Sequence, residues 1–322
     1  MAYSGKNTGY ENFFLANEVE DMYTSHLDNQ QFCTIDNTLV GTAGMKKLVN
    51  VYSSTEGTQK LAVGYGNNKS ITVGYTQKEY EIVMAQTRFE YYDEEAMNDP
   101  MVVLTGTRRA GVDIFNVVNG DIVTELEKAE IVIIPSSSDY FGAFVDAQAA
   151  MNVEANDGTG SSTTFALVKP TIVAALRKAF RDDLKYVESY VRTGYIGTVG
   201  GTNLYTSKLA GAADIVVATK EAVTVFNKKG AEVEQITNGN RGASDANTRL
   251  NTLFARKYYV AALTDATKAA KIAIGATASL SADTEVNSAK TYYALSGTAY
   301  VKATPAAGDN PVSKGWYEIS FS

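Results

Sequence analysis

Apolar and polar residues alternate with a period of two along residues 69–75 and 80–91, which is the pattern of half-buried β-strands. A further β-rich run covers residues 45–54, and the sequence YGNNKS at 65–70 supplies turn-forming residues between the runs. This pattern predicts a long β-ribbon with a hairpin tip at 65–70. Because two strands alone are marginally stable in water, we expect the ribbon to lie against another surface.

Two other stretches carry apolar residues at helical spacing. The first predicts one long helix over about 100–129, roughly 40 Å in length, and the second predicts a helix over about 170–191. The first stripe consists of Leu104, Gly111, Phe115, Val118, Ile122, Leu126 and Ala129. The second consists of Ile172, Leu176, Ala179, Phe180, Leu184, Val187 and Tyr190. Each helix is expected to bury this one face.

The remaining pattern mixes short helices and strands. It predicts a buried strand ending at Pro135, a helix capped by Ser137 or Ser138, a hairpin over 195–209, a strand over 214–218, a short helix over 220–228 and a strand over 253–265. Because helices and strands alternate irregularly, the α+β class is favoured. Residues 274–322 are rich in Ala, Ser and Thr with short aromatic strands, and they predict a small all-β module.

Residues 1–40 are polar, with scattered aromatic residues and too few periodic apolar positions to form a core of their own. A short helix over 11–27 is the main local feature. The segment holds six acidic residues against one lysine, Lys6, whereas the rest of the chain is nearly balanced within a total net charge of −7. We expect an acidic arm that gains order by lying on another surface.

The composition excludes several kinds of chemistry. With one cysteine, Cys33, no intramolecular disulfide can form, and with one histidine, His26, catalytic triads and Cys/His zinc sites are disfavoured. No run of about 18 apolar residues is present, and the first residues lack the regions of a signal peptide. The acidic balance disfavours tight nucleic-acid binding by the whole surface. We therefore expect no metal, no cofactor and no contact with a membrane.

A glycine-rich stretch at 194–208, GYIGTVGGTNLYTSK, has the composition of a nucleotide loop. A P-loop ends in Gly-Lys-Ser/Thr and enters a helix, and a dinucleotide loop has the spacing G-x-G-x-x-G between a strand and a helix. Here the spacing is G-x-x-G-x-x-G-G, after a predicted helix and before a predicted strand. We interpret Gly194, Gly197, Gly200 and Gly201 as a structural turn that leads into a hairpin.

Two aromatic residues of the C-terminal module, Trp316 and Tyr317, leave two interpretations open. Exposed aromatic rings can stack on sugars or on a protein partner, whereas buried rings form the core of a small β module. The second interpretation is favoured, because a module of this size needs large apolar side chains to fold.

The order of these parts resembles the major capsid proteins of tailed bacteriophages, which have the Hong Kong 97-type fold. The stretch YVRTGYIGTVGGTNLYTSK is similar to the family pattern GxIGxxxGxxVYxSxxL. The segments ADIVVATKEAVTVFNKKGAEVE and RLNTLFARKYYVAALTDATKAAKI follow in the order expected of such proteins. The resemblance covers about residues 1–273, and the order of the motifs over some 170 residues carries it more than any single motif.

The resemblance implies a division of the chain into five parts. These are an N-terminal arm at 1–44, an extended β-hairpin loop at 45–79, a peripheral domain with its spine helix at 80–134, an axial domain with a closing strand at 135–273, and the accessory β module at 274–322. It also implies that the glycine turn belongs to the axial domain. Six basic residues would face packaged DNA, an acidic arm or solvent: Arg108, Arg109, Arg177, Lys178, Arg181 and Lys185.

By the same resemblance the protein would not be an enzyme. It would assemble with itself into pentamers and hexamers of an icosahedral shell around double-stranded DNA, in the virion, after assembly in the host bacterial cytoplasm. A separate scaffolding protein, a portal and a decoration protein are the implied partners. Two alternatives stay open: an encapsulin-like nanocompartment shell, and a surface adhesin or carbohydrate-binding protein that acts through residues 274–322.

Overall fold

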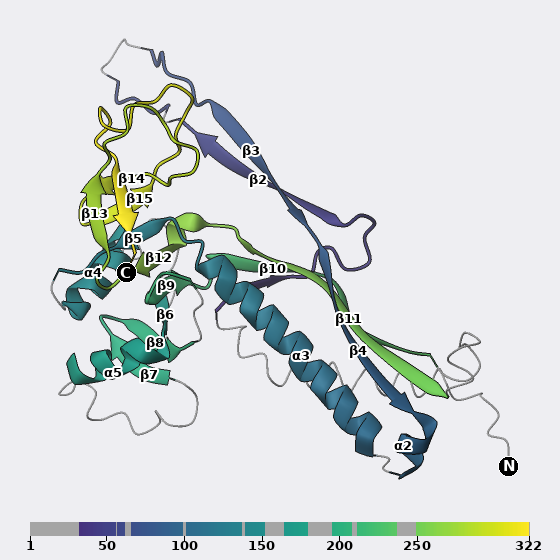
Figure 1. Cartoon of the computed structure of the whole chain (residues 1–322). Helices are drawn as coiled ribbons and strands as arrows, with labels where there is room; N and C mark the ends of the chain where they lie inside the picture. The colour runs from purple at the N-terminus through teal and green to yellow at the C-terminus, as the bar shows by residue number, and fades with distance from the viewer. Residues whose placement is uncertain are drawn as a thin grey trace.

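The computed structural model describes residues 32–55, 57–61, 66–98, 101–136, 139–151, 164–179, 195–207, 211–236 and 249–321. The arm up to residue 31, with His26, lies outside these residues, and so does the second half of the helix predicted over 170–191. The described chain is elongated (Figure 1), with a long helix, a four-stranded sheet beside it, a ten-stranded sheet at one end and a two-stranded ribbon. This arrangement confirms the α+β class.

The four-stranded sheet has the order β1 (Thr34–Asp36), β10 (Val223–Ile236), β11 (Leu250–Leu263) and β4 (Val83–Tyr92). β1 runs parallel to β10, and the other neighbours are antiparallel. The short helix predicted over 220–228 is therefore wrong, since β10 begins at Val223. Val223, Val225 and Phe226 are all buried in the core, and pairing with β11 outweighs the weak local helical preference.

The helix α3 (Met101–Leu126) packs along this sheet and follows its strands in Figure 1. Its buried stripe consists of Thr107, Ala110, Gly111, Ile114, Val118, Ile122 and Leu126. In the C-terminal half of α3 the buried residues are those of the predicted stripe. In the N-terminal half Ala110 and Ile114 are buried, whereas the predicted Leu104 and Phe115 are only half-buried. The shorter helix α2 (Asp93–Asn98) precedes α3.

Hydrogen bonds from carboxylates also hold α3 on the sheet. The Tyr259 hydroxyl of β11 donates to Asp121 at 2.6 Å, and the Thr87 hydroxyl of β4 donates to Asp113 at 2.8 Å. Just after the helix, the Glu127 carboxylate accepts from the Gly211 backbone N–H at 2.8 Å. These bonds lock the helix in register, because each acid meets a partner on a different segment.

The ten-stranded sheet mixes strands from distant parts of the chain. Its order is β13 (Thr277–Leu280), β16 (Tyr317–Ser320), β14 (Tyr293–Ser296), β15 (Ala299–Lys302), β5 (Ile131–Ile133), β12 (Ala269–Ile272), β9 (Ile215–Thr219), β6 (Thr164–Val168), β8 (Thr202–Thr206) and β7 (Tyr195–Val199). The helices α4 (Tyr140–Ala150) and α5 (Pro170–Ala179) pack against it, and η3 (Ala266–Lys268) is a single 3-10 turn before β12.

The N-terminus of α4 corrects one prediction. Its capping residue is Asp139, whose side chain accepts a hydrogen bond from the Gly142 N–H at 2.9 Å. The predicted caps, Ser137 and Ser138, lie outside the described residues. Asp139 immediately precedes the first helical residue, so its carboxylate reaches a free N–H of the first turn. The negative charge of this carboxylate is also stabilised by the positive end of the helix dipole.

The C-terminal segment is all-β, as predicted, but its strands continue the main sheet. β15 pairs with β5 in the register Ala299↔Ile133 to Val301↔Ile131. Val132, on β5, is fully buried in a cluster with Ala273, Ala276 and Tyr293. The segment therefore shares its core with the rest of the chain, a connection that short alternating strands in a sequence do not specify.

We expect a chain that ends at Gly275 to be insoluble or to unfold without cooperativity. Loss of β15 leaves one edge of β5 unpaired and exposes Val132, and an uncovered strand edge promotes aggregation. Solubility and a thermal melt followed by circular dichroism measure this. The substitution Leu295→Ser, at an exposed position of the same segment, is the control and should change stability by less than about 0.5 kcal/mol. A soluble truncated chain with a sharp melt would contradict the shared core.

Candidate functional site

The ribbon consists of β2 (Lys46–Ser54) and β3 (Val73–Glu81), paired antiparallel over their whole length. Figure 1 shows it extending from the start of β4, at the opposite end of that strand from α2. The described residues of the connection between the strands, which joins Ser54 to Val73, form no strand, although Thr55 and Thr72 exchange hydrogen bonds. The strand pairing therefore stops at Ser54 and Val73, whereas the sequence predicts a hairpin tip at 65–70, whose first residue lies outside the described ones.

Several large apolar side chains of the ribbon are exposed to solvent. Val73 and Tyr75 on β3 are 62% and 67% exposed, and Leu48 on β2 is also more than half exposed. Ile71, two residues before β3, is 62% exposed. Apolar side chains that cluster on an elongated projection mark a surface that binds another molecule. The ribbon contributes such a surface without having a core of its own.

The base of the ribbon is fastened to the four-stranded sheet. Lys47 Nζ lies 3.2 Å from Asp36 Oδ2, and it also lies 5.6 Å from the centroid of the Phe226 ring. The Tyr80 ring stacks on the same Phe226 ring, with 5.6 Å between the two centroids. Ile82, where β3 passes into β4, is buried. These contacts fix the direction in which the ribbon leaves the sheet.

The glycine-rich stretch forms the turn of the β7–β8 hairpin. Gly200 and Gly201 have φ of +53° and +82°, the sign that a type I′ turn requires at both central residues. Gly197 has a φ of +138° beside a bulge in β7, and Gly194 lies outside the described residues.

A buried polar cluster holds this turn against α4. Gln148 Nε2 donates to the Gly200 carbonyl and to the Thr202 hydroxyl, both at 2.6 Å, and the Thr164 and Thr202 hydroxyls lie 3.0 Å apart. The side chains of Gln148, Thr164 and Thr202 are buried. Since the cluster binds the turn through a carbonyl oxygen and not through free N–H groups, it is built to hold the hairpin and not a phosphate.

We expect Gly201→Val to lower the free energy of unfolding by about 1–3 kcal/mol, because a β-branched residue is strained at this φ. Gly201→Asn is the matched variant and should cost less, since asparagine tolerates the left-handed region. Urea unfolding of the two variants and the parent chain measures the difference. Equal losses for valine and asparagine would contradict a requirement for positive φ.

The structure describes the side chains of only two of the six basic candidates. Arg108 and Arg109 are exposed on α3. Arg177 and Lys178 belong to α5, but their side chains are not described, and Arg181 and Lys185 lie outside the described residues. Contact of these residues with DNA or with an acidic segment stays a prediction.

The two aromatic candidates of the C-terminal segment are packed. Trp316 is only 8% exposed, and its ring lies 5.8 Å from that of Tyr292 between centroids. Tyr317 is half-buried and meets the edge of Tyr300 at 5.3 Å. An exposed pair of stacking rings is therefore wrong for Trp316, because its ring is buried beside Tyr292.

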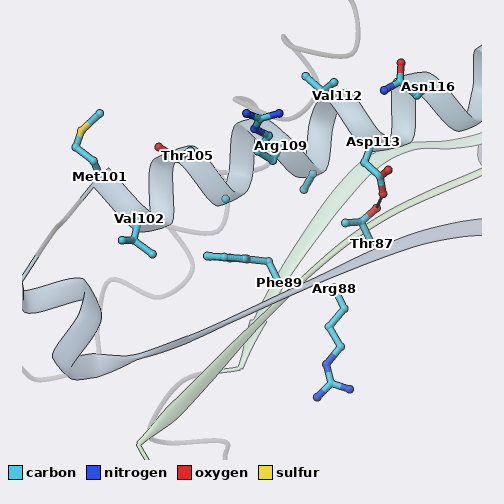
Figure 2. A pocket seen from close by; sticks show the side chains of 12 residues that line it. Thr87, Arg88, Phe89, Met101, Val102, Thr105, Arg109, Val112, Asp113 and Asn116 are labelled. Carbon is cyan, nitrogen blue, oxygen red and sulfur yellow. Dashed lines mark hydrogen bonds between the residues drawn. The ribbon is translucent and has the colours of Figure 1, made fainter.

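A groove of about 720 Å³ lies between the first half of α3 and β4 (Figure 2). Phe89 reaches from β4 toward the helix and closely approaches Gly106, and a Cβ atom at Gly106 would lie 2.4 Å from the Phe89 ring. Val102 and Arg109 also line the groove. No periodic signal in the sequence indicates it, because Phe89 and Gly106 meet only after the helix has docked.

Two glycines of α3 form a matched pair for testing this packing. Gly120→Ala should stabilise the protein by up to about 1 kcal/mol, because alanine is the better helix former and nothing lies within 4 Å of the new methyl group. Gly106→Ala gains the same preference but pushes Phe89 aside, so it should be less stable than Gly120→Ala. Thermal unfolding of both variants checks the order, and a reversed order would contradict the contact.

The described residues show no other chemical centre. Among them, no group of three or more His, Cys, Asp or Glu is placed to hold a metal ion, and no helix is long and apolar enough to cross a membrane. Burial raises the pKa of the Cys33 thiol to about 11, so this cysteine is protonated at neutral pH and unreactive.

No protein-family model and no curated protein matches the sequence. The mature capsid of bacteriophage PhiM1 superposes with a TM-score of 0.56 and 9% identity, over 76% of this chain and 86% of the other. The capsid of cyanophage P-SCSP1u gives a TM-score of 0.57 and 10% identity, over 76% and 87%. The chain has the Hong Kong 97-type capsid fold.

The Hong Kong 97-type fold of this chain is also similar to the virus-like particle of Pyrococcus furiosus. That structure superposes with a TM-score of 0.52 and 12% identity, over 81% of this chain and 99% of the other. The predicted resemblance is thus confirmed for the fold. The boundaries of the five predicted parts and the roles of the candidate residues stay predictions.

Proposed function

We propose that this protein is the major capsid protein of a tailed bacteriophage. Its subunits would form the pentamers and hexamers of an icosahedral shell that encloses double-stranded DNA. The exposed apolar ribbon carries the proposal, because it belongs to a fold shared with phage capsids and has a surface that needs a partner.

The energetics of the ribbon favour assembly over a free subunit. Two strands with open edges are marginal in water, and their exposed apolar residues would be buried when a neighbouring subunit covers them. Burial stabilises by about 25 cal/mol per Å² of apolar surface, so a few such side chains per contact accumulate over many contacts in a closed shell.

The proposed role is structural and needs no catalysis. Within it, the partners would be other copies of this chain, a separate scaffolding protein, a portal and a decoration protein, with non-specific contacts to the packaged DNA. The protein would be assembled in the cytoplasm of the host bacterium and would end in the shell of the virion.

A nanocompartment shell is the second candidate, motivated by the similarity to the Pyrococcus furiosus virus-like particle. The two candidates differ in their contents, which are DNA in one case and protein in the other. The adhesin alternative is not proposed, since burial of Trp316 removes the exposed ring on which it depended.

Electron microscopy of the purified protein, with and without co-expressed genes from its neighbourhood, tests the proposal. We expect closed shells or rings of five and six subunits, and nuclease-protected DNA in particles recovered from infected cells. Particles that hold a protein cargo and no DNA would favour the second candidate. A monomer under every assembly condition would contradict both.

Substitutions on the ribbon test the observation that carries the proposal. Val73→Asp combined with Tyr75→Asp should abolish shells in micrographs and leave the melting temperature of the subunit unchanged, because both side chains are already exposed in it. Leu280→Asp is the matched control: Leu280 is 62% exposed, like Val73, but lies on β13, far from the ribbon in sequence. Normal shells from the double variant would contradict the role of the ribbon.

A further inference from the structure

The helix α4 is apolar on the side that faces solvent as well as on the side that faces the sheet. Ala143, Phe144 and Ala147 are buried in the core of the ten-stranded sheet. On the opposite side of the helix, Phe141 and Val145 are 54% and 42% exposed. A surface helix ordinarily turns a polar face to water, and a helix that is apolar all round is normally buried. The outer side of α4 therefore has the composition of a contact surface.

The exposed residues of this helix form one continuous strip. Phe141, Val145 and Ala149 are all exposed, and they lie above one another because they are four residues apart. We call these three residues the outer strip. The two acids of this region lie beside the strip, Asp139 as the capping residue before the helix and Asp146 half-buried on its flank. The outer strip itself carries no charge.

The β7–β8 turn borders the outer strip without covering it. A Cβ atom at Gly200 would lie 3.8 Å from Val145 Cγ2, so a larger side chain at this position would lie over the strip. Gln148, on the buried side of the same helix, holds the turn in place through the Gly200 carbonyl at 2.6 Å. The strip and the turn thus form one surface that is fixed before any partner binds.

Neighbouring parts of the sequence do not supply a cover for the strip. Residues 152–163, which follow α4, read NVEANDGTGSST, and Val153 is their only large apolar residue. Residues 180–194 hold more apolar residues. Phe180, Leu184 and Val187 continue at helical spacing the stripe of Leu176, which is buried in the core of the same sheet. The sequence therefore assigns them to the inner face of that helix.

Charge favours a second copy of this chain as the partner. The chain has a net charge of −7, so two copies repel each other unless they meet at a surface without charge. The same net charge disfavours a polyanion such as nucleic acid. The outer strip is an uncharged, apolar surface, which two copies can bury between them without bringing like charges together.

We propose that the outer strip of α4 is a contact between two copies of this chain, with the β7–β8 turn at its border. The inference rests on the proposed function, because it requires that copies assemble. It concerns a surface separate from the ribbon, since α4 packs on the ten-stranded sheet and the ribbon extends from the start of β4 (Figure 1). A chain with two separate contact surfaces can bind two neighbours at once, as a closed shell requires.

Photo-cross-linking of the full chain tests the contact, with p-benzoyl-phenylalanine in place of Phe141. Copies labelled with ¹⁴N and ¹⁵N are mixed before assembly, so that mass spectrometry distinguishes cross-links between chains from cross-links within one chain. We expect cross-links between chains. Val145→Asp should lower their yield about tenfold, because it buries an unpaired charge at the centre of the contact.

Val312→Asp is the matched control. Val312 is 48% exposed, similar to Val145, but lies in the C-terminal segment, and its substitution should leave the yield unchanged. Both variants should keep the melting temperature of the subunit, since both side chains are already exposed in it. A lowered yield with an unchanged melt separates loss of the contact from loss of the fold.

The outcomes distinguish this contact from the proposed function. Cross-links from position 141 only to the same chain would overturn the contact, because residues such as 180–194 would then cover the strip. Closed shells without cross-links between chains, or with a yield unchanged by Val145→Asp, would overturn the contact alone. Cross-links between chains in dimers or rings that never close into shells would support the contact and contradict the proposed function. A monomer without cross-links would overturn both.

Discussion

The packing of α3 on β4, β11 and β10 is the interaction on which the rest of the structure depends. The helix buries Ile114, Val118, Ile122 and Leu126 against the sheet. Such side chains contribute about 1.5–3 kcal/mol each when fully buried. Burial of an apolar stripe alone would allow the helix to shift along its axis over the sheet. Hydrogen bonds from Thr87, Tyr259 and Gly211 to carboxylates on or just after the helix fix its position.

The position of α3 decides where the exposed parts of the molecule lie. β4 continues directly into β3 through the buried Ile82, so the sheet under the helix also fixes the base of the ribbon. The joint of Lys47, Asp36, Tyr80 and Phe226 adds a second attachment. The proposed shell would require such a rigid base. A neighbouring subunit can bind the exposed apolar ribbon repeatedly in the same way only if the ribbon leaves the sheet at a defined angle.

The ten-stranded sheet explains how one chain combines distant segments into a second core. β5 lies between β12 and β15, so residues 131–133 join the middle of the chain to its C-terminal segment. At the end of the strand order where β8 and β7 lie, the Gln148 cluster holds the β7–β8 turn against α4. Both contacts link elements separated by more than fifty residues, and both are buried, so each part of this sheet stabilises the other.

Local pattern in the sequence determined much of this protein. The period of Val118, Ile122 and Leu126 predicts the long helix, and alternation over 80–91 predicts a strand there, most of which is β4. The spacing of Gly200 and Gly201 excludes a nucleotide loop in favour of a hairpin turn. These features depend on neighbouring residues, whose preferences are readable one segment at a time. The resemblance of the ordered motifs then identified the fold.

Only the tertiary structure decided the remaining features. Residues 223–228 form a strand because β11 pairs with them, Trp316 is buried because the C-terminal strands join β5, and the α3–β4 groove exists because Phe89 meets Gly106. Each depends on contacts between residues far apart in the chain. Local periodicity carries no information on such contacts, since the free energy that selects them comes from burial and pairing that exist only after the elements have docked.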